Sequence, residues 1–157
     1  MAVDQIPDWR QVALLAESVQ EWLQSMPELT PALCRLDELA KIDRDNYPYG
    51  GEHTSERAVM AAKTFLMLAN VRYRESVGAG IVPYFIGPVP DGGVQLKWRT
   101  TPAQLWLVFH PLGGYGYLFE DRTQPGAFEE SDDIPLQEAL SLIGKALLPR
   151  VRAAGGV

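Results

Sequence analysis

The chain has 157 residues, of which 46% are hydrophobic and 22% charged, and its formal net charge is −6. This length and composition predict one globular domain, residues 1–157, with a core large enough to fold without a disulfide or a structural metal. The negative charge disfavours a nucleic-acid partner, because phosphate groups repel an acidic protein.

The single cysteine, Cys34, excludes a disulfide within the chain and argues against a secreted protein. The first ten residues contain two acids and no apolar run, unlike a signal peptide. No window approaches the roughly 18 apolar residues that a membrane-spanning helix needs. We therefore expect a cytoplasmic protein with no membrane partner.

Residues 5–77 are predicted to form three helices. In residues 12–26, apolar side chains recur at spacings of three and four, which is typical of an amphipathic helix, and Pro27 ends it. Thr30 followed by Pro31 predicts the start of a second helix.

Residues 43–53 interrupt this pattern with a polar loop that contains glycine, Tyr47 and Tyr49. The loop is expected either to pack over the helices or to bind a partner, since tyrosines are favoured contact residues. Thr54 is the predicted N-cap of the third helix, which should end within residues 73–77.

Residues 81–121 change to the period of two that predicts β-strands. Residues 81–89 contain two prolines, which favour an edge strand. Residues 94–99 alternate apolar and polar side chains, residues 104–110 are more apolar, and residues 115–120 are aromatic. Short turns join these segments, so we predict a four-stranded antiparallel meander.

Residues 124–133 read as a polar connector, after which Asp132 or Asp133 should cap a C-terminal helix over residues 133–150. The predicted fold class is therefore α+β. It has three N-terminal helices, a β-meander over residues 81–121 and one C-terminal helix packed on the sheet.

The sequence contains no nucleophile elbow, zinc-protease motif, paired-cysteine motif or phosphate-binding loop. With two histidines and one cysteine, a structural zinc site is disfavoured. We predict no metal, no cofactor and no catalytic residue. The alternative is a small hydrolase-like enzyme in which His53 or His110 pairs with an aspartate, for His110 either Asp43 or Asp45.

The third predicted strand is apolar on both faces, and the strand after it adds aromatic residues. Either the helices cover both faces of the sheet, or part of this surface stays uncovered and contacts a protein. The expected contact residues are Tyr47, Tyr49, Lys97, Arg99, Trp106, Tyr115 and Tyr117.

Two segments together resemble a group of small uncharacterised bacterial proteins. The segments are Asn46-Tyr47-Pro48-Tyr49-Gly50-Gly51, which precedes a helix, and the hairpin Pro88-Val89-Pro90-Asp91-Gly92-Gly93-Val94-Gln95-Leu96-Lys97-Trp98. The resemblance covers residues 43–120. The chain departs from the group at Tyr47-Pro48, where the group has Asp-Gly, and at Lys97, where it has Glu. The resemblance implies a bacterial source and an α+β fold, and it brings no activity.

The leading functional hypothesis is a non-enzymatic protein–protein interaction module, or an accessory subunit of a bacterial system. Its partner is another protein. Besides the enzyme named above, a self-associating structural protein remains an alternative, because prolines protect only one strand edge of the predicted sheet.

Overall fold

The computed structural model describes residues 26–42, 51–124 and 126–155, with side chains as far as residue 148. These residues form one α+β unit with a five-stranded antiparallel sheet. In chain order the elements are η2 (Pro27–Leu29), α2 (Thr30–Lys41), α3 (Glu56–Val77), η4 (Gly78–Ile81), β1 (Phe85–Pro88), β2 (Val94–Arg99), β3 (Ala103–Phe109), β4 (Tyr115–Asp121), β5 (Phe128–Ile134) and α4 (Leu136–Gly155).

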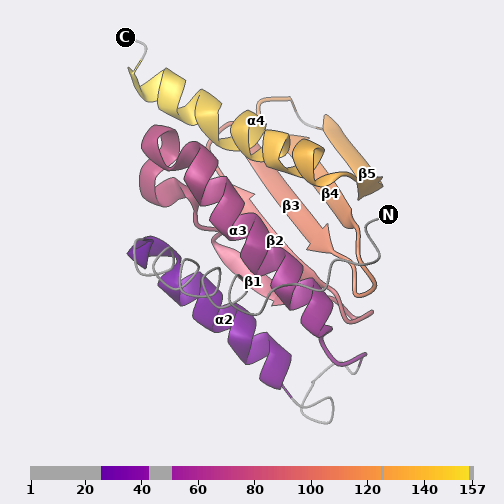
Figure 1. Ribbon diagram of the computed structural model, residues 1–157. Helices are drawn as coiled ribbons and strands as arrows, with labels where there is room; N and C mark the ends of the chain where they lie inside the picture. Colours follow the sequence, from indigo (N-terminus) through magenta and orange to yellow (C-terminus); the bar gives the residue numbers. More distant parts are fainter. Residues whose placement is uncertain (1–25, 43–50, 125, 156–157) are drawn as a thin grey trace, which may run out of the picture.

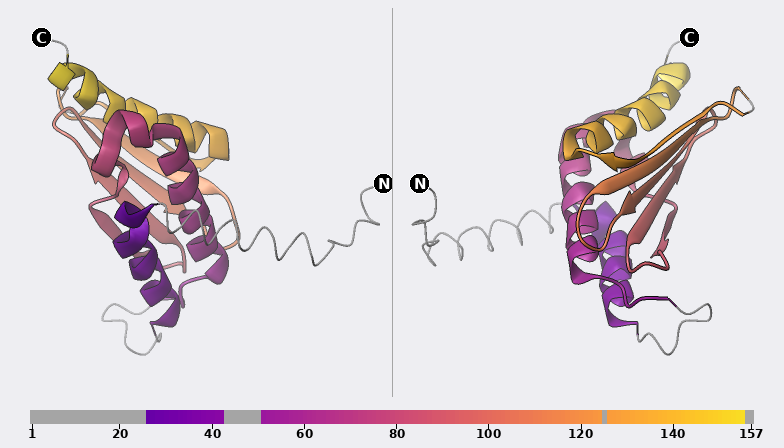
Figure 2. Two further views of the ribbon diagram at one scale, coloured as in Figure 1. Left: turned by 60° about the vertical axis from the view of Figure 1, so that its left-hand side comes forward. Right: turned by 90° about the vertical axis from the view of Figure 1, so that its right-hand side faces the viewer.

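The strands lie in the order β1-β2-β3-β4-β5, so each strand pairs with its neighbour in sequence and the sheet is a simple meander. Helices α2, α3 and α4 lie across the sheet in Figure 1. Figure 2 shows that all three are on the same side. Within the described residues, the sheet therefore has one face covered by helices and one face open.

The core lies between this helix layer and the covered face. Trp98, Leu105 and Phe109 are fully buried there, and the ring of Phe65 from α3 makes edge-on contacts with Trp98 and Phe109 at centroid distances of 6.1 and 5.6 Å. The indole nitrogen of Trp98 donates to the backbone oxygen of Ile81 at 2.8 Å, so its polar group is satisfied inside the core.

The sheet has a fifth strand where the sequence predicted a polar connector. Strand β5 is charged because it lies at the edge of the sheet, and only Ile134 of its seven residues is buried. Charged side chains are common on edge strands, where they oppose pairing with another chain. The predicted cap at Asp132 or Asp133 is also wrong, because both residues belong to β5 and α4 begins at Leu136.

Two of the predicted boundaries are wrong. Ser55, rather than Thr54, is the N-cap of α3, and its Oγ accepts from the backbone nitrogen of Ala58 at 3.3 Å. Ile81 belongs to η4, so β1 is shorter than predicted. Residues 5–25 of the predicted first helix lie outside the described residues. The second helix is confirmed as α2.

The described residues that follow the first segment of the resemblance contact the hairpin that forms the second. The backbone nitrogen of Glu52 donates to Pro90 O at 2.9 Å, and that of Ser55 donates to Gly92 O at 2.8 Å. Gly92 has a φ of +94°, and a Cβ at Gly93 would lie 2.6 Å from the backbone oxygen of Phe109. The two glycines are therefore required by the close approach of three backbone segments.

Along the part of the chain that the structure describes, no helix has both the length and the apolar character needed to cross a membrane.

Candidate functional site

Two rows of side chains run across the strands on the open face of the sheet. The register places Phe85, Lys97, Trp106, Leu118 and Glu130 side by side in the first row, from β1 to β5. It places Arg99, Gln104, Glu120 and Phe128 in the second row, from β2 to β5. Tyr84, just before β1, adjoins Arg99. These ten residues define what we call the open face.

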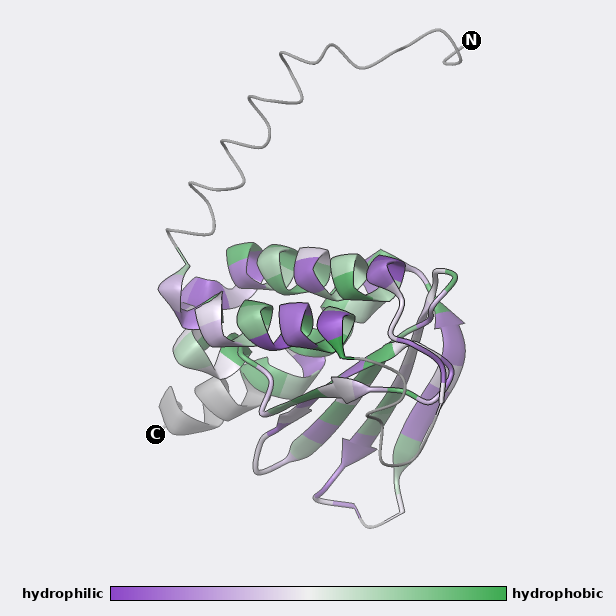
Figure 3. Ribbon diagram, turned by 90° about the horizontal axis from the view of Figure 1, so that it is seen from below, coloured by the Kyte–Doolittle hydropathy of each residue, from purple (hydrophilic) through white to green (hydrophobic). Residues whose placement is uncertain are grey.

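Hydropathy alternates along the strands that form this face (Figure 3). In β2 the residues that point to the helices are buried, whereas Lys97 is partly exposed and Arg99 is exposed. This is the pattern of a sheet with one dry and one accessible face.

Two cations of the open face stack on aromatic rings. Nζ of Lys97 lies 4.2 Å from the ring centroid of Trp106 and 4.7 Å from that of Phe85. The guanidinium carbon of Arg99 lies 4.8 Å from the ring centroid of Tyr84, whose hydroxyl oxygen accepts from Nη2 at 3.3 Å. Such contacts restrict the freedom of the two long side chains and keep their charges beside the aromatic rings.

Charge is divided across the open face. The cations Lys97 and Arg99 lie on β2, whereas the carboxylates Glu120 and Glu130 lie on β4 and β5. Among the described residues, none of these four side chains has an oppositely charged group within ion-pair distance. All four charges are therefore available to a partner.

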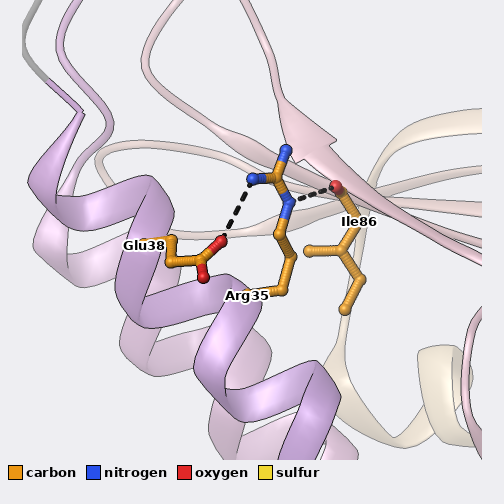
Figure 4. Close-up of polar contacts among 3 residues, drawn as sticks. All are labelled: Arg35, Glu38 and Ile86. Carbon is orange, nitrogen blue, oxygen red and sulfur yellow. Dashed lines mark hydrogen bonds and ion pairs between the residues drawn. The ribbon is translucent and has the colours of Figure 1, made fainter.

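Both edges of the sheet are protected from pairing with another strand. At the β1 edge, Nε of Arg35 on α2 donates to the backbone oxygen of Ile86 at 3.4 Å, and Glu38 pairs with the same guanidinium (Figure 4). At the other edge, β5 presents four carboxylates, Glu129, Glu130, Asp132 and Asp133. Contact through the face is therefore favoured over pairing of edges.

A cleft of about 610 Å³ adjoins the open face at the end of β2. Its walls are mostly apolar and include Val77, Val82, Trp98 and Leu147, and Arg99 supplies the charge at its rim. A shallower groove of about 370 Å³ separates α2 from Tyr84 and Phe85. Among the described residues that line them, neither the cleft nor the groove has a carboxylate or a histidine, so these residues form no acid–base pair there.

The two histidines contact backbone oxygens rather than carboxylates. Nε2 of His110 lies 2.8 Å from the backbone oxygen of Asp132, and Nδ1 of His53 lies 2.9 Å from that of Thr54. Asp43 and Asp45, the predicted partners, lie outside the described residues. No group of three or more metal-ligating side chains occurs in the part of the chain that the structure describes.

The structure brings together three of the seven predicted contact residues. Lys97, Arg99 and Trp106 lie on the open face. Tyr115 and Tyr117 lie on the covered face, partly buried against the core. Their place follows from the register, which pairs Tyr115 with the buried Phe109 and Tyr117 with the buried Leu107. Tyr47 and Tyr49 lie outside the described residues.

Sequence reasoning missed seven members of the open face. Their positions follow from the strand register, because residues opposite Lys97 and Arg99 must share their face. The missed residues are Tyr84, Phe85, Gln104, Leu118, Glu120, Phe128 and Glu130. Phe128 and Glu130 belong to a strand that the sequence did not predict.

Comparisons with protein-family models, with curated proteins and with solved structures found no match for this chain.

Proposed function

We propose that the chain is a non-enzymatic protein-binding module, an accessory component of a bacterial system, that docks its partner on the open face of the sheet. One observation carries the proposal. Lys97 and Arg99 are held on aromatic rings, without an acidic partner among the described residues, on a sheet face that no described element covers.

The residue types of this face support a role in protein contact. Trp, Tyr and Arg are the residues that most often dominate the binding energy of protein interfaces. Trp106 lies at the centre of the first row, with a cation on one side and Leu118 on the other. A central aromatic anchor with charged groups around it is the usual anatomy of such an interface.

The chemistry of the face also defines its partner. The partner should present carboxylates opposite Lys97 and Arg99, cations opposite Glu120 and Glu130, and an apolar centre opposite Trp106. A nucleic acid offers anionic phosphates to Lys97 and Arg99 but no cation to Glu120 and Glu130. The enzyme alternative has less support, since neither His53 nor His110 contacts a carboxylate among the described residues.

The test begins with affinity capture from lysate of the native host, followed by purification of the captured protein and measurement of its Kd by calorimetry. We expect Trp106→Ala to weaken binding about 30-fold, the effect of losing a hot-spot residue. Arg99→Ala should weaken it as well. Glu138→Ala, an exposed change on α4, is the matched control and should leave the Kd unchanged.

Each variant is first compared with the intact chain by circular dichroism, so that loss of binding is separated from loss of folding. An unchanged Kd for both folded open-face variants, with a purified partner that binds the intact chain, would place the contact elsewhere and overturn the proposal.

A further inference from the structure

The open face has a pattern that complements itself. From β2 to β4 the second row reads Arg99, Gln104, Glu120, with a cation at one end and an acid at the other. Aromatic rings lie at both outer ends, Phe85 on β1 and Phe128 on β5. The face therefore offers, on its β4–β5 half, the groups that its β1–β2 half requires of a partner.

Two copies of the chain can stack their open faces about a two-fold axis that runs parallel to β3 between the two sheets. This arrangement brings the complementary groups of the two faces together. It places β2 of one copy opposite β4 of the other, and β1 opposite β5. Arg99 then faces Glu120 of the second copy, and Trp106 faces the equivalent Trp106. Stacked sheets keep their strands aligned within about 30°, so these opposite positions are retained near the axis.

The same axis gives Lys97 a suitable environment. Lys97 lies over Leu118 of the second copy. Glu130 of that copy is one strand spacing, about 4.8 Å, further along the row. The chain's Lys97 thus keeps its aromatic neighbours and gains a carboxylate within reach of its side chain. A two-fold axis across the strands would instead place like charges opposite each other, which is unfavourable.

We infer that the partner on the open face is a second copy of this chain, bound face to face as a two-fold symmetric β-sandwich dimer; this inference rests on the proposed function. The helices of the two copies then lie on the outside. An isologous contact of this kind closes on itself and does not build a filament. The blocked edges of β1 and β5 leave the face as the favoured contact between copies.

The size of the face predicts a weak dimer. Five strands about 4.8 Å apart and roughly six residues long form a surface of about 20 Å by 20 Å. Two such surfaces bury roughly 800 to 1,000 Å² in total, which is below the usual size of a stable interface. We expect a dissociation constant in the micromolar range that rises as salt screens the exposed charges.

The decisive experiment uses two single variants and their mixture, measured by sedimentation equilibrium from about 5 to 500 μM in low salt. Arg99→Glu places two acids opposite each other at both ends of the dimer, and Glu120→Arg places two cations there. Each variant alone should dimerise at least tenfold more weakly than the intact chain. An equimolar mixture should regain the dimer, because every facing pair is again of opposite charge.

A cross-linking measurement tests the geometry independently. In a chain carrying Cys34→Ser, Gln104→Cys places a thiol on the central strand near the axis, where the opposing backbones are about 10 Å apart. A bis-maleimide of about that length should link the two copies. Ser141→Cys, exposed on α4, is the control and should not be linked.

The outcomes separate this inference from the proposed function. An intact chain that stays monomeric at 500 μM overturns the second-copy inference. In that case the effect of Trp106→Ala on a purified partner decides the proposed function by itself. A dimer that both charge variants leave intact, or a mixture that does not recover, also overturns the inference. Recovery in the mixture together with linkage at position 104 supports it.

Discussion

The covered and open faces of the sheet are built from alternate residues of the same strands, yet their chemistry is different. In β2, Val94, Leu96 and Trp98 are buried under the helices, whereas Lys97 and Arg99 remain accessible. The covered face is apolar across its central strands and obtains its stability from packing. The open face combines rings with cations and acids that have no oppositely charged neighbour among the described residues. One face thus holds the fold together, and the other is the face on which we propose that a partner docks.

The largest expected difference in the free energy of unfolding is between two single variants, each of which removes the tryptophan of one face. Trp98→Ala removes a fully buried ring that contacts Phe65, and it should lower the free energy of unfolding by about 3–5 kcal/mol. Trp106→Ala should lower it by only about 1 kcal/mol, because this ring is partly exposed and its buried Nε1 has no described partner. Urea unfolding at low protein concentration gives both values, and equal losses would contradict the distinction between the faces.

The next effect concerns the turn that fixes which residues reach which face. Gly93→Ala would place a Cβ 2.6 Å from the backbone oxygen of Phe109 and should cost about 2–3 kcal/mol. The control is Gly80→Ala, whose Cβ meets only a side-chain carbon of Val77, at 3.1 Å, and which should cost less than about 1 kcal/mol. Similar melting temperatures for the two variants would show that the hairpin tolerates the close contact.

A smaller effect compares two tyrosine hydroxyls on opposite sides of the molecule. Tyr73 donates to the backbone oxygen of Leu140 at 2.9 Å in the buried contact between α3 and α4. Tyr73→Phe leaves that oxygen without this donor and should cost about 1 kcal/mol. Tyr84→Phe removes an exposed hydroxyl beside Arg99 and should change stability by less than about 0.5 kcal/mol. Thermal unfolding of both variants checks the ranking.

The smallest effect concerns Glu28 of the helix layer. Unlike the charged side chains of the open face, Glu28 has an oppositely charged neighbour among the described residues, Arg74. A hydrogen bond from Nδ2 of Asn70, together with the nearby Arg74 guanidinium, holds the pKa of Glu28 below its ordinary range. The lowered pKa means that folding favours the ionised form. Its contribution is therefore present above the unfolded pKa of about 4.3 and is lost as the pH falls through the lower folded value.

Glu28→Gln should accordingly be less stable than the intact chain at pH 7, and the difference should shrink as the pH falls below about 4. Hydrogen bonds from Thr123 also lower the pKa of Asp121. The intact chain and Glu28→Gln should therefore both lose some stability in acid. If the difference in stability between Glu28→Gln and the intact chain does not depend on pH, the ionised carboxylate of Glu28 does not stabilise the fold.

Sequence reasoning was most successful where the pattern is local. Thr30 and Pro31 began a helix as predicted, and the alternation of residues 94–99 identified β2 and its two faces. It failed at β5, because a strand at a sheet edge does not need the apolar alternation by which strands are recognised. Sequence reasoning also placed Tyr115 and Tyr117 on the expected contact surface. Alternation within one strand shows which residues share a face, but it does not show how that strand is aligned with the next.

The sequence by itself determined the α+β class, the two-residue period of β2 and β3, and the glycines that the turn before β2 requires, because these depend on neighbours along the chain. Only the tertiary structure decided that the three described helices share one side of the sheet. It also decided that Lys97, Trp106 and Glu130 form one row on the other side. The physical reason is that strand register and helix placement are set by packing between residues far apart in the sequence, and a single strand records only which of its residues alternate.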